Sequence, residues 1–170
     1  METAYVGVGS NIEPETNVIR SLELLKGRVQ VTAVSQIFTT VPIGRPDQER
    51  YANGVFRIET DLGPRELKGL FRSIEDSLGR TRTEDRYAPR TIDLDLVLYG
   101  ERVIREPGLV VPNPDLLARP FLAAALLQIA PELVVPGLDK PLAQLVKIEP
   151  GELVVNSRLT LEVARRARYE

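Results

Sequence analysis

The sequence contains no cysteine, no histidine and no tryptophan, and only one methionine. The absence of cysteine excludes a disulfide framework and leaves the redox compartment undetermined. The absence of histidine excludes Ser-His-Asp catalysis and zinc sites with histidine ligands. Any chemistry must therefore use carboxylates, arginines, lysines, hydroxyls or amides.

The chain also lacks a strong excess of one charge and any long apolar run. Its formal net charge is −2, whereas a general nucleic-acid binder depends on a large excess of lysine and arginine. The N-terminus has an acidic second residue and no apolar stretch behind a basic start, which is unlike a signal peptide. We therefore expect a cytoplasmic protein that binds neither nucleic acid nor membranes.

The composition is close to that of an average globular domain. Of the 170 residues, 43% are hydrophobic and 27% are charged. This is enough apolar material for a sizeable core without metals or disulfides. We expect a single domain over residues 1–170, monomeric or weakly dimeric, in which the tail 150–170 has no assigned role.

Prolines and glycines divide the chain into alternating strands and helices. Alternating and β-branched patterns predict strands, and apolar residues at helical spacing after a proline predict helices. The resulting order β-α-β-β-α-β predicts an α+β fold with a ferredoxin-like core and a C-terminal α/β extension. The predicted strands are 4–8, 29–38, 53–60, 92–99 and a short piece at 109–111, and the predicted helices are 14–27, 64–79, 120–131 and a surface helix at 159–169.

Asp93 and Asp95 lie two residues apart in the predicted strand 92–99. Residues at this spacing share one face of a strand, and the apolar residues between them bury the other face. Neighbouring carboxylates repel unless a cation lies between them, and Mg²⁺ binds one or two carboxylates together with phosphate oxygens. The pair predicts a magnesium site, although such a pair at a strand end also occurs without any metal.

Four arginines precede this strand within eleven residues, namely Arg80, Arg82, Arg86 and Arg90. The planar guanidinium group binds phosphate oxygens in pairs. An arginine-rich loop can also be a plain solvated loop. Beside paired carboxylates, and without a glycine-rich phosphate loop elsewhere, the arginines favour a polyphosphate site that serves phosphoryl transfer.

The segment RYAPRTIDLDL, residues 86–96, resembles the signature of the 6-hydroxymethyl-7,8-dihydropterin pyrophosphokinase family. Further segments resemble the same family at separate places, so the resemblance covers about residues 3–145. It implies Mg²⁺-dependent transfer of pyrophosphate from ATP to the pterin alcohol, with AMP as the second product, in folate biosynthesis. The further segments are YVGVGSN (5–11), TVPIG (40–44), DQ (47–48), YAN (51–53), VP (111–112) and IAPEL (129–133).

The resemblance also implies a role for each matching residue. Asp93 and Asp95 would bind two Mg²⁺ ions, and Arg80 and Arg90 would act with them next to the transferred group. The implied ATP-binding residues are Glu75, Arg80, Arg82, Tyr87, Arg90, Asn113 and Arg119. The implied substrate-binding residues are Thr40, Pro42, Ile43, Gly44, Tyr51, Asn53 and Phe121.

The implied pterin residues also have a physical rationale. A flat heterocycle is bound well between aromatic faces such as Tyr51 and Phe121, next to an amide such as Asn53 that donates and accepts hydrogen bonds. Plain core packing of the rings, or a turn at Asn53, remains open. Asn113 departs from the family, which often has histidine there, and asparagine cannot carry charge.

Three functional hypotheses follow. The first is the pterin pyrophosphokinase, with the loop 80–90 closing over ATP. The second keeps the metal and nucleotide site but transfers to another alcohol. The third is a non-catalytic ferredoxin-like module, because a fold alone does not fix a function.

Overall fold

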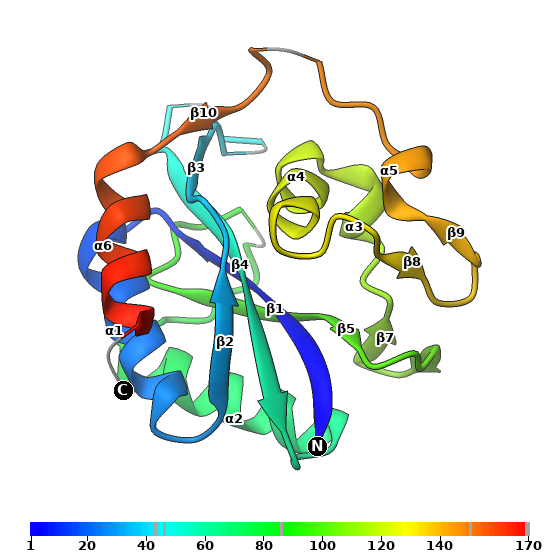
Figure 1. Cartoon of the computed structure of the whole chain (residues 1–170). Helices are drawn as coiled ribbons and strands as arrows, with labels where there is room; N and C mark the ends of the chain where they lie inside the picture. The colour runs from blue at the N-terminus through cyan, green and yellow to red at the C-terminus, as the bar shows by residue number, and fades with distance from the viewer. Residues whose placement is uncertain (43, 46, 86, 150, 169–170) are drawn as a thin grey trace.

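An antiparallel sheet forms the centre of the molecule (Figure 1). The computed structural model describes residues 1–168 except 43, 46, 86 and 150, so Ile43 and Arg86 lie outside the described residues. The sheet has the order β10-β3-β4-β1-β5, and β2 also pairs with β4. Its strands are β1 (Glu2–Ser10), β2 (Gln30–Val34), β3 (Phe38–Thr40), β4 (Tyr51–Thr60), β5 (Asp93–Tyr99) and β10 (Val154–Val155).

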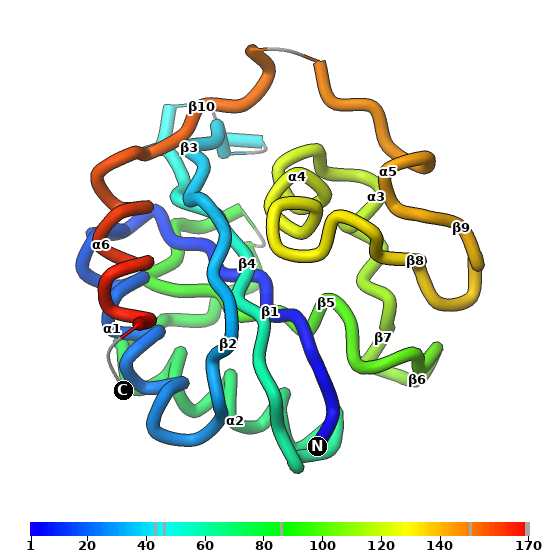
Figure 2. The backbone as a smooth tube through the Cα atoms, viewed as in Figure 1, coloured from blue at the N-terminus to red at the C-terminus, as the bar shows by residue number. Residues whose placement is uncertain are grey.

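Helices cover both faces of this sheet (Figures 1 and 2). α1 (Pro14–Lys26), α2 (Pro64–Ser77) and α6 (Ser157–Arg168) lie on one side, and α4 (Pro120–Ile129) lies on the other. α1, α2 and α4 each begin at a proline, whose missing N–H is not needed in the first helical turn. The helix predictions that rested on these prolines are confirmed.

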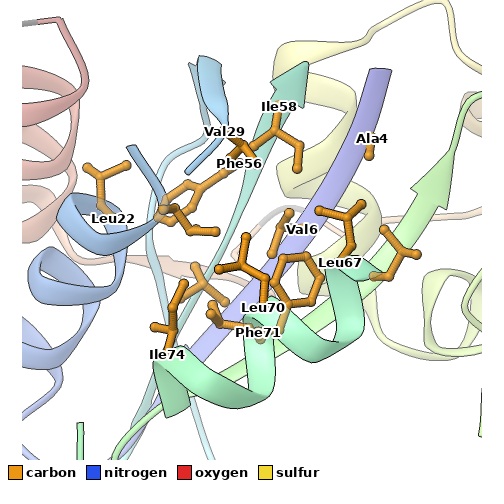
Figure 3. Close-up of a cluster of buried hydrophobic side chains, with 14 of the residues drawn as sticks. Ala4, Val6, Leu22, Val29, Phe56, Ile58, Leu67, Leu70, Phe71 and Ile74 are labelled. Carbon is orange, nitrogen blue, oxygen red and sulfur yellow. The ribbon is translucent and has the colours of Figure 1, made fainter. Parts of the chain in front are cut away.

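The larger core lies between the sheet and the helices α1 and α2 (Figure 3). Phe56 and Ile58 of β4 are fully buried and belong to the same cluster as Leu22 of α1 and Leu67 of α2. The apolar stripe of α2 therefore faces the sheet as its helical spacing predicts. Leu94 and Leu96 of β5 join this core, and they fix the face on which their neighbours Asp93 and Asp95 lie.

A second core forms beneath α4 on the opposite face. Tyr5, Val55 and Val97 of the sheet pack with Leu122 and Leu126 of this helix. Two short helices and a small hairpin complete this side of the molecule: α3 (Asp115–Ala118), β8 (Val134–Val135), β9 (Lys140–Pro141) and α5 (Leu142–Leu145). A second hairpin, β6 (Ile104–Glu106) with β7 (Leu109–Val111), contributes Ile104, Leu109 and Val111 to the larger core instead.

The prediction of one strand over 29–38 is wrong. The chain forms β2, leaves the regular ladder at residues 35–37, and resumes as β3. The Ser35 hydroxyl accepts a hydrogen bond from Val55 N–H at 2.9 Å, and the N–H groups of Gln36 and Ile37 donate to the side chains of Gln128 and Thr160. Side-chain acceptors from elsewhere in the fold thus replace the strand ladder, which local sequence does not reveal.

The tail forms a helix as predicted, but one face of it is buried. Leu159 and Val163 of α6 are buried in the larger core. Among the described residues, no helix is both long and apolar enough to cross a membrane.

Candidate active site

A cavity of about 890 Å³ opens on the α4 side of the sheet and extends to residues of α2. On this face, Tyr5, Val55 and Val97 lie beneath α4. The alternate positions further along the same strands face the cavity, and the sheet residues at these positions are glycine or polar. They are Gly7 and Gly9 of β1, Asn53 of β4, and Asp93 and Asp95 of β5.

Glycines of β1 form part of the cavity floor. Gly9 pairs with Asp93 and Gly7 pairs with Asp95 across the β1–β5 ladder. A Cβ atom on Gly9 would lie 2.8 Å from Oδ1 of Asn53. A side chain at this position would therefore displace the Asn53 amide, and glycine keeps the space free.

The carboxylate of Asp93 forms ion pairs with two arginines. Its Oδ1 lies 3.0 Å from Arg80 and its Oδ2 lies 2.7 Å from Arg90. All three side chains are mostly shielded from solvent, so these charge-assisted contacts are stronger than a surface pair. The structure thus joins the predicted arginine loop directly to the predicted aspartate pair.

Glu75 holds two of the arginines from beneath. Its side chain is buried, with the residue only 6% exposed. Its carboxylate accepts a hydrogen bond from Leu94 N–H at 2.9 Å and pairs with Arg80 at 2.9 Å and Arg82 at 2.7 Å. A buried carboxylate requires such partners, and here they fix β5 and both arginines relative to α2.

Asp95 differs from the other acidic residues of the cavity because its carboxylate has no arginine partner in the described structure. Its side chain is open to solvent in the cavity, while protein atoms surround it on most sides. Burial, together with the negative charges of Asp93 and Glu75, raises the pKa of Asp95 to about 7, although the positive charge of Arg90 opposes the shift. Within the described part of the chain no group of three acidic ligands occurs, so an ion at this pair would need other oxygens.

Two aromatic side chains and one amide side chain lie at the β3–β4 end of the cavity. Asn53 donates from Nδ2 to the Thr40 hydroxyl at 2.6 Å. Tyr51 and Phe121 line the same cavity. Burial raises the pKa of the Tyr51 phenol, while the nearby guanidinium of Arg90 opposes this effect. This end of the cavity is therefore adjacent to the arginine cluster.

The two loops around the cavity contact each other. Gly44 has φ +78°, and a Cβ on it would lie 3.2 Å from the Tyr87 ring, so this glycine packs against the ring. The buried side chain of Asn11 accepts from Arg90 N–H at 2.8 Å and donates to the Glu49 carbonyl at 3.2 Å. In the sequence, Asn11 stands out only as the last residue of the segment 5–11 that resembles the family, and its link between the loops was missed.

Asn113 and Arg119 line the same cavity from the segment before α4. The Asn113 side chain accepts from Asp115 N–H at 2.9 Å, and Arg119 lies 3.5 Å from the Asp115 carboxylate. The Asn113 oxygen therefore orders the turn into α3, a structural contact that the sequence did not predict.

A basic face of α2 also borders the cavity and was missed. Arg65, Lys68 and Arg72 line it at spacings of three and four residues, which places them on one side of a helix. The signal was present in the sequence as the polar complement of the apolar stripe. All predicted site residues that the structure describes line this cavity, apart from Gly44.

Paired carboxylates, clustered arginines and an aromatic end within one cavity are typical of an enzyme that transfers phosphoryl groups. Residues 5–131 match the 7,8-dihydro-6-hydroxymethylpterin-pyrophosphokinase (HPPK) family. The match spans most of the chain, which belongs to this family. Membership favours an enzyme over the non-catalytic module considered above.

Individual relatives agree with this assignment. The chain is 41% identical over 133 residues to the 2-amino-4-hydroxy-6-hydroxymethyldihydropteridine pyrophosphokinase of Bacillus subtilis, covering 76% of this chain and 79% of that protein. It is 36% identical over 139 residues to the pyrophosphokinase of the same name from Pseudomonas aeruginosa, covering 80% and 85%.

A solved structure shares the fold. The Plasmodium falciparum HPPK-DHPS structure has a TM-score of 0.62 and 12% identity, and the match covers 85% of this chain and 43% of that one. This chain therefore spans less than half the length of the Plasmodium chain.

Proposed function

We propose that this chain transfers the pyrophosphoryl group of ATP to the hydroxymethyl group of 6-hydroxymethyl-7,8-dihydropterin, a step of folate biosynthesis. The observation that carries the proposal is the placement of Asp93 and Asp95 on one face of β5, in the cavity that Arg80 and Arg90 also line. Family membership and the names of its relatives support the same reaction.

The aspartate pair fits Mg²⁺. Asp95 carries a raised pKa beside two other carboxylates, which is the setting in which a bound cation relieves repulsion. Two carboxylates leave the remaining positions of an octahedral ion to water and phosphate oxygens, as Mg²⁺ requires. We propose two ions at this pair, which would neutralise phosphate charge and polarise the reacting oxygens when bound.

The arginines and the basic face of α2 are proposed to hold ATP. Arg80, Arg82, Arg90 and Arg119 would bind phosphate oxygens through their guanidinium groups. In the described structure the first three are paired with Asp93 and Glu75, so triphosphate binding would exchange some of these contacts. Glu75 would then position arginines rather than contact the nucleotide.

The β3–β4 end of the cavity is proposed to hold the pterin. Tyr51 and Phe121 offer ring faces, and Asn53 offers an amide already oriented by Thr40 at 2.6 Å. Pro42 lines this end, and Gly44 is proposed to act through its contact with Tyr87. Tyr87 and Asn113 complete the proposed ATP side.

In the reaction, the pterin hydroxyl oxygen would attack the β-phosphorus of ATP in line. A bond forms between this oxygen and the β-phosphorus, and the bond between the β-phosphorus and the oxygen that bridges it to the α-phosphorus breaks. AMP leaves with the bridging oxygen, and the hydroxyl proton passes to solvent. The protein contributes positioning and charge stabilisation rather than covalent chemistry. The arginines would stabilise the negative charge of the transferred group.

We further propose a single domain whose strands β5-β1-β4-β2, with α1 and α2 on one face, form a ferredoxin-like core. The antiparallel order and the crossing connections support this description. The proposed site draws on residues of one chain, so a monomer or weak dimer suffices. We propose a cytoplasmic location because the reaction consumes ATP.

A direct assay tests the proposed function. The purified chain is incubated with ATP, Mg²⁺ and reduced 6-hydroxymethylpterin, and AMP and the pterin diphosphate are separated by chromatography. We expect both products in equal amounts, and neither when EDTA replaces Mg²⁺. AMP formation with another alcohol but not with this pterin would instead select the second hypothesis, a transferase with a different acceptor.

A further inference from the structure

The C-terminal segment packs against the strand that leads into the cavity. The family match ends at residue 131, and the later strand β10 pairs antiparallel with β3, with Val154 opposite Thr39 and Val155 opposite Phe38. β3 ends at Thr40, which lines the cavity and accepts the hydrogen bond from Asn53. A segment outside the family match thus lies beside the strand that carries Thr40 (Figure 1).

The same segment satisfies the backbone where the sheet is interrupted. Ile37, in the break between β2 and β3, donates its N–H to the Thr160 hydroxyl at 2.9 Å. Its carbonyl accepts from Asn156 N–H at 2.7 Å. Because Ile37 is fully buried, losing either partner would leave a polar group unsatisfied away from water.

α6 is itself firmly attached, so it can act as a support. Leu159 and Val163 are buried in the larger core. The Asn156 side chain accepts from Leu159 N–H at 3.1 Å and orders the first turn of the helix. Lys26 of α1 donates to the Arg166 carbonyl at 2.6 Å near the other end.

β3 is a short strand with a neighbour on each side. It has three residues, which pair with β4 on one side, where Phe38 lies opposite Asn53 and Thr40 lies opposite Tyr51. β10 occupies the other side. β10 is thus one of the two strands that hold β3 in the sheet, so the C-terminal segment contributes to the placement of Thr40.

We propose that residues 154–168 are a positioning element for the pterin end of the cavity, with Thr160 as its positioning residue. The Thr160 hydroxyl fixes Ile37, Ile37 fixes the start of β3, and β3 presents Thr40 to Asn53. The element contacts β3, β2 and α1, so we expect it to affect pterin binding. Arg80, Arg82 and Arg90, which are proposed to bind ATP, extend from the α2–β5 connection instead. The inference rests on the proposed function.

Substitution of Thr160 in the full-length chain tests this role. Thr160→Val keeps the shape of the side chain and removes the acceptor. We expect the KM for the pterin to rise about 3- to 10-fold, the magnitude of one lost hydrogen bond, while kcat and the KM for ATP stay unchanged. Direct titration of the pterin by its fluorescence should weaken equally, and amide exchange at residues 38–40 should accelerate.

Two matched variants separate positioning from general stability. Thr160→Ser keeps the hydroxyl and should restore the wild-type KM. Val163→Ala loosens the packing of the same helix without touching Ile37, so it should lower the melting temperature and leave the ratio of the two KM values unchanged.

Other results would overturn the inference. A Thr160→Val variant that raises both KM values alike, or a Val163→Ala variant that reproduces the pterin-selective change, would show a general stabilising role. A wild-type chain that neither binds nor converts the pterin would overturn the proposed function first. In that case, unchanged exchange at residues 38–40 in Thr160→Val would also overturn the positioning role.

Discussion

At the residue scale, the least compensated charge of the cavity is Asp95. Asp93 and Glu75 each pair with arginines, whereas the carboxylate of Asp95 forms no hydrogen bond or ion pair within the described part of the chain. Its carboxylate is the group best placed to bind a cation rather than an arginine. Two predictions follow from this difference.

Asp95→Asn should keep the fold and lose activity. The amide has nearly the same size but no negative charge, so cation binding weakens, and we expect AMP formation to fall by about 100-fold or more. AMP release and the melting temperature are measured for both proteins. The control is Asp61→Asn, which removes an exposed carboxylate beside the N-terminal amino group. A folded Asp95→Asn variant with full activity would contradict the metal role of Asp95.

Asp95 should also make stability depend on pH in the protein without metal. Burial and neighbouring carboxylates raise its pKa from 3.8 to about 7 in the folded state. The folded state then binds the proton more tightly than the unfolded state, so this group lowers stability as pH rises between those values. Asp95→Asn should therefore be more stable than wild type at pH 8 and lose this advantage near pH 4.

Urea unfolding in EDTA at several pH values measures this effect. The difference in midpoint between Asp95→Asn and wild type should grow as the pH rises. A difference that stays constant from pH 4 to pH 8 would show that the carboxylate titrates normally.

Gly9 is the second residue with a specific spatial demand. A Cβ atom would lie 2.8 Å from Oδ1 of Asn53, so Gly9→Ala should turn the amide away from Thr40. We expect the KM for the pterin to rise about 10-fold, with a smaller change for ATP. Gly27→Ala, where the added atom meets only a carbonyl at 3.5 Å, is the matched control; equal effects of the two variants would refute the role of Gly9.

At the scale of elements, the connection between α2 and β5 combines two contradictory features. Arg80, Arg82 and Arg90 tie its ends to Glu75 and Asp93, while residues 83–85 and Tyr87 between them are exposed, and Tyr87 contacts Gly44 of the opposite loop. A loop fixed at its ends and exposed between them is suited to closing over a ligand.

Hydrogen exchange tests this closure. We expect amides of residues 81–89 to become more protected when Mg²⁺ and a non-hydrolysable ATP analogue are added, because the triphosphate gives the arginines new partners. The helix α6 is the internal control and should not change. Unchanged protection of 81–89 at saturating analogue would exclude a lid.

At the scale of the molecule, one sheet separates two cores, and the cavity lies on the side where α4 leaves part of the sheet uncovered. The larger core includes residues of the sheet, α1, α2 and α6, so the C-terminal helix belongs to the same folding unit as the first strand. The residues at the proposed ATP and pterin ends of the cavity come from segments far apart in the sequence, between Gly7 and Leu122.

We therefore expect one cooperative thermal transition for the whole chain, with equal calorimetric and van't Hoff enthalpies. A Mg²⁺–ATP analogue at 100 times its Kd should stabilise the folded state by about 2.7 kcal/mol. Differential scanning calorimetry measures both effects. A separate low-temperature transition that disappears on removal of residues 150–170 would show that the tail folds independently.

Sequence alone indicated which side chains gather at the cavity and much of their local arrangement. The alternation Ile92-Asp93-Leu94-Asp95 dictates that both carboxylates share a face, because strand geometry has a period of two. Proline and glycine positions likewise bounded α1 and α2. These features depend on neighbours along the chain, which is why they were readable.

Tertiary structure alone decided the features that depend on distant partners. The interruption at Ser35–Ile37 requires acceptors from Gln128 and Thr160, and Glu75 is buried because Leu94, Arg80 and Arg82 converge on it. Hydrogen bonds across such separations are satisfied by the three-dimensional arrangement and leave no periodic pattern in the chain.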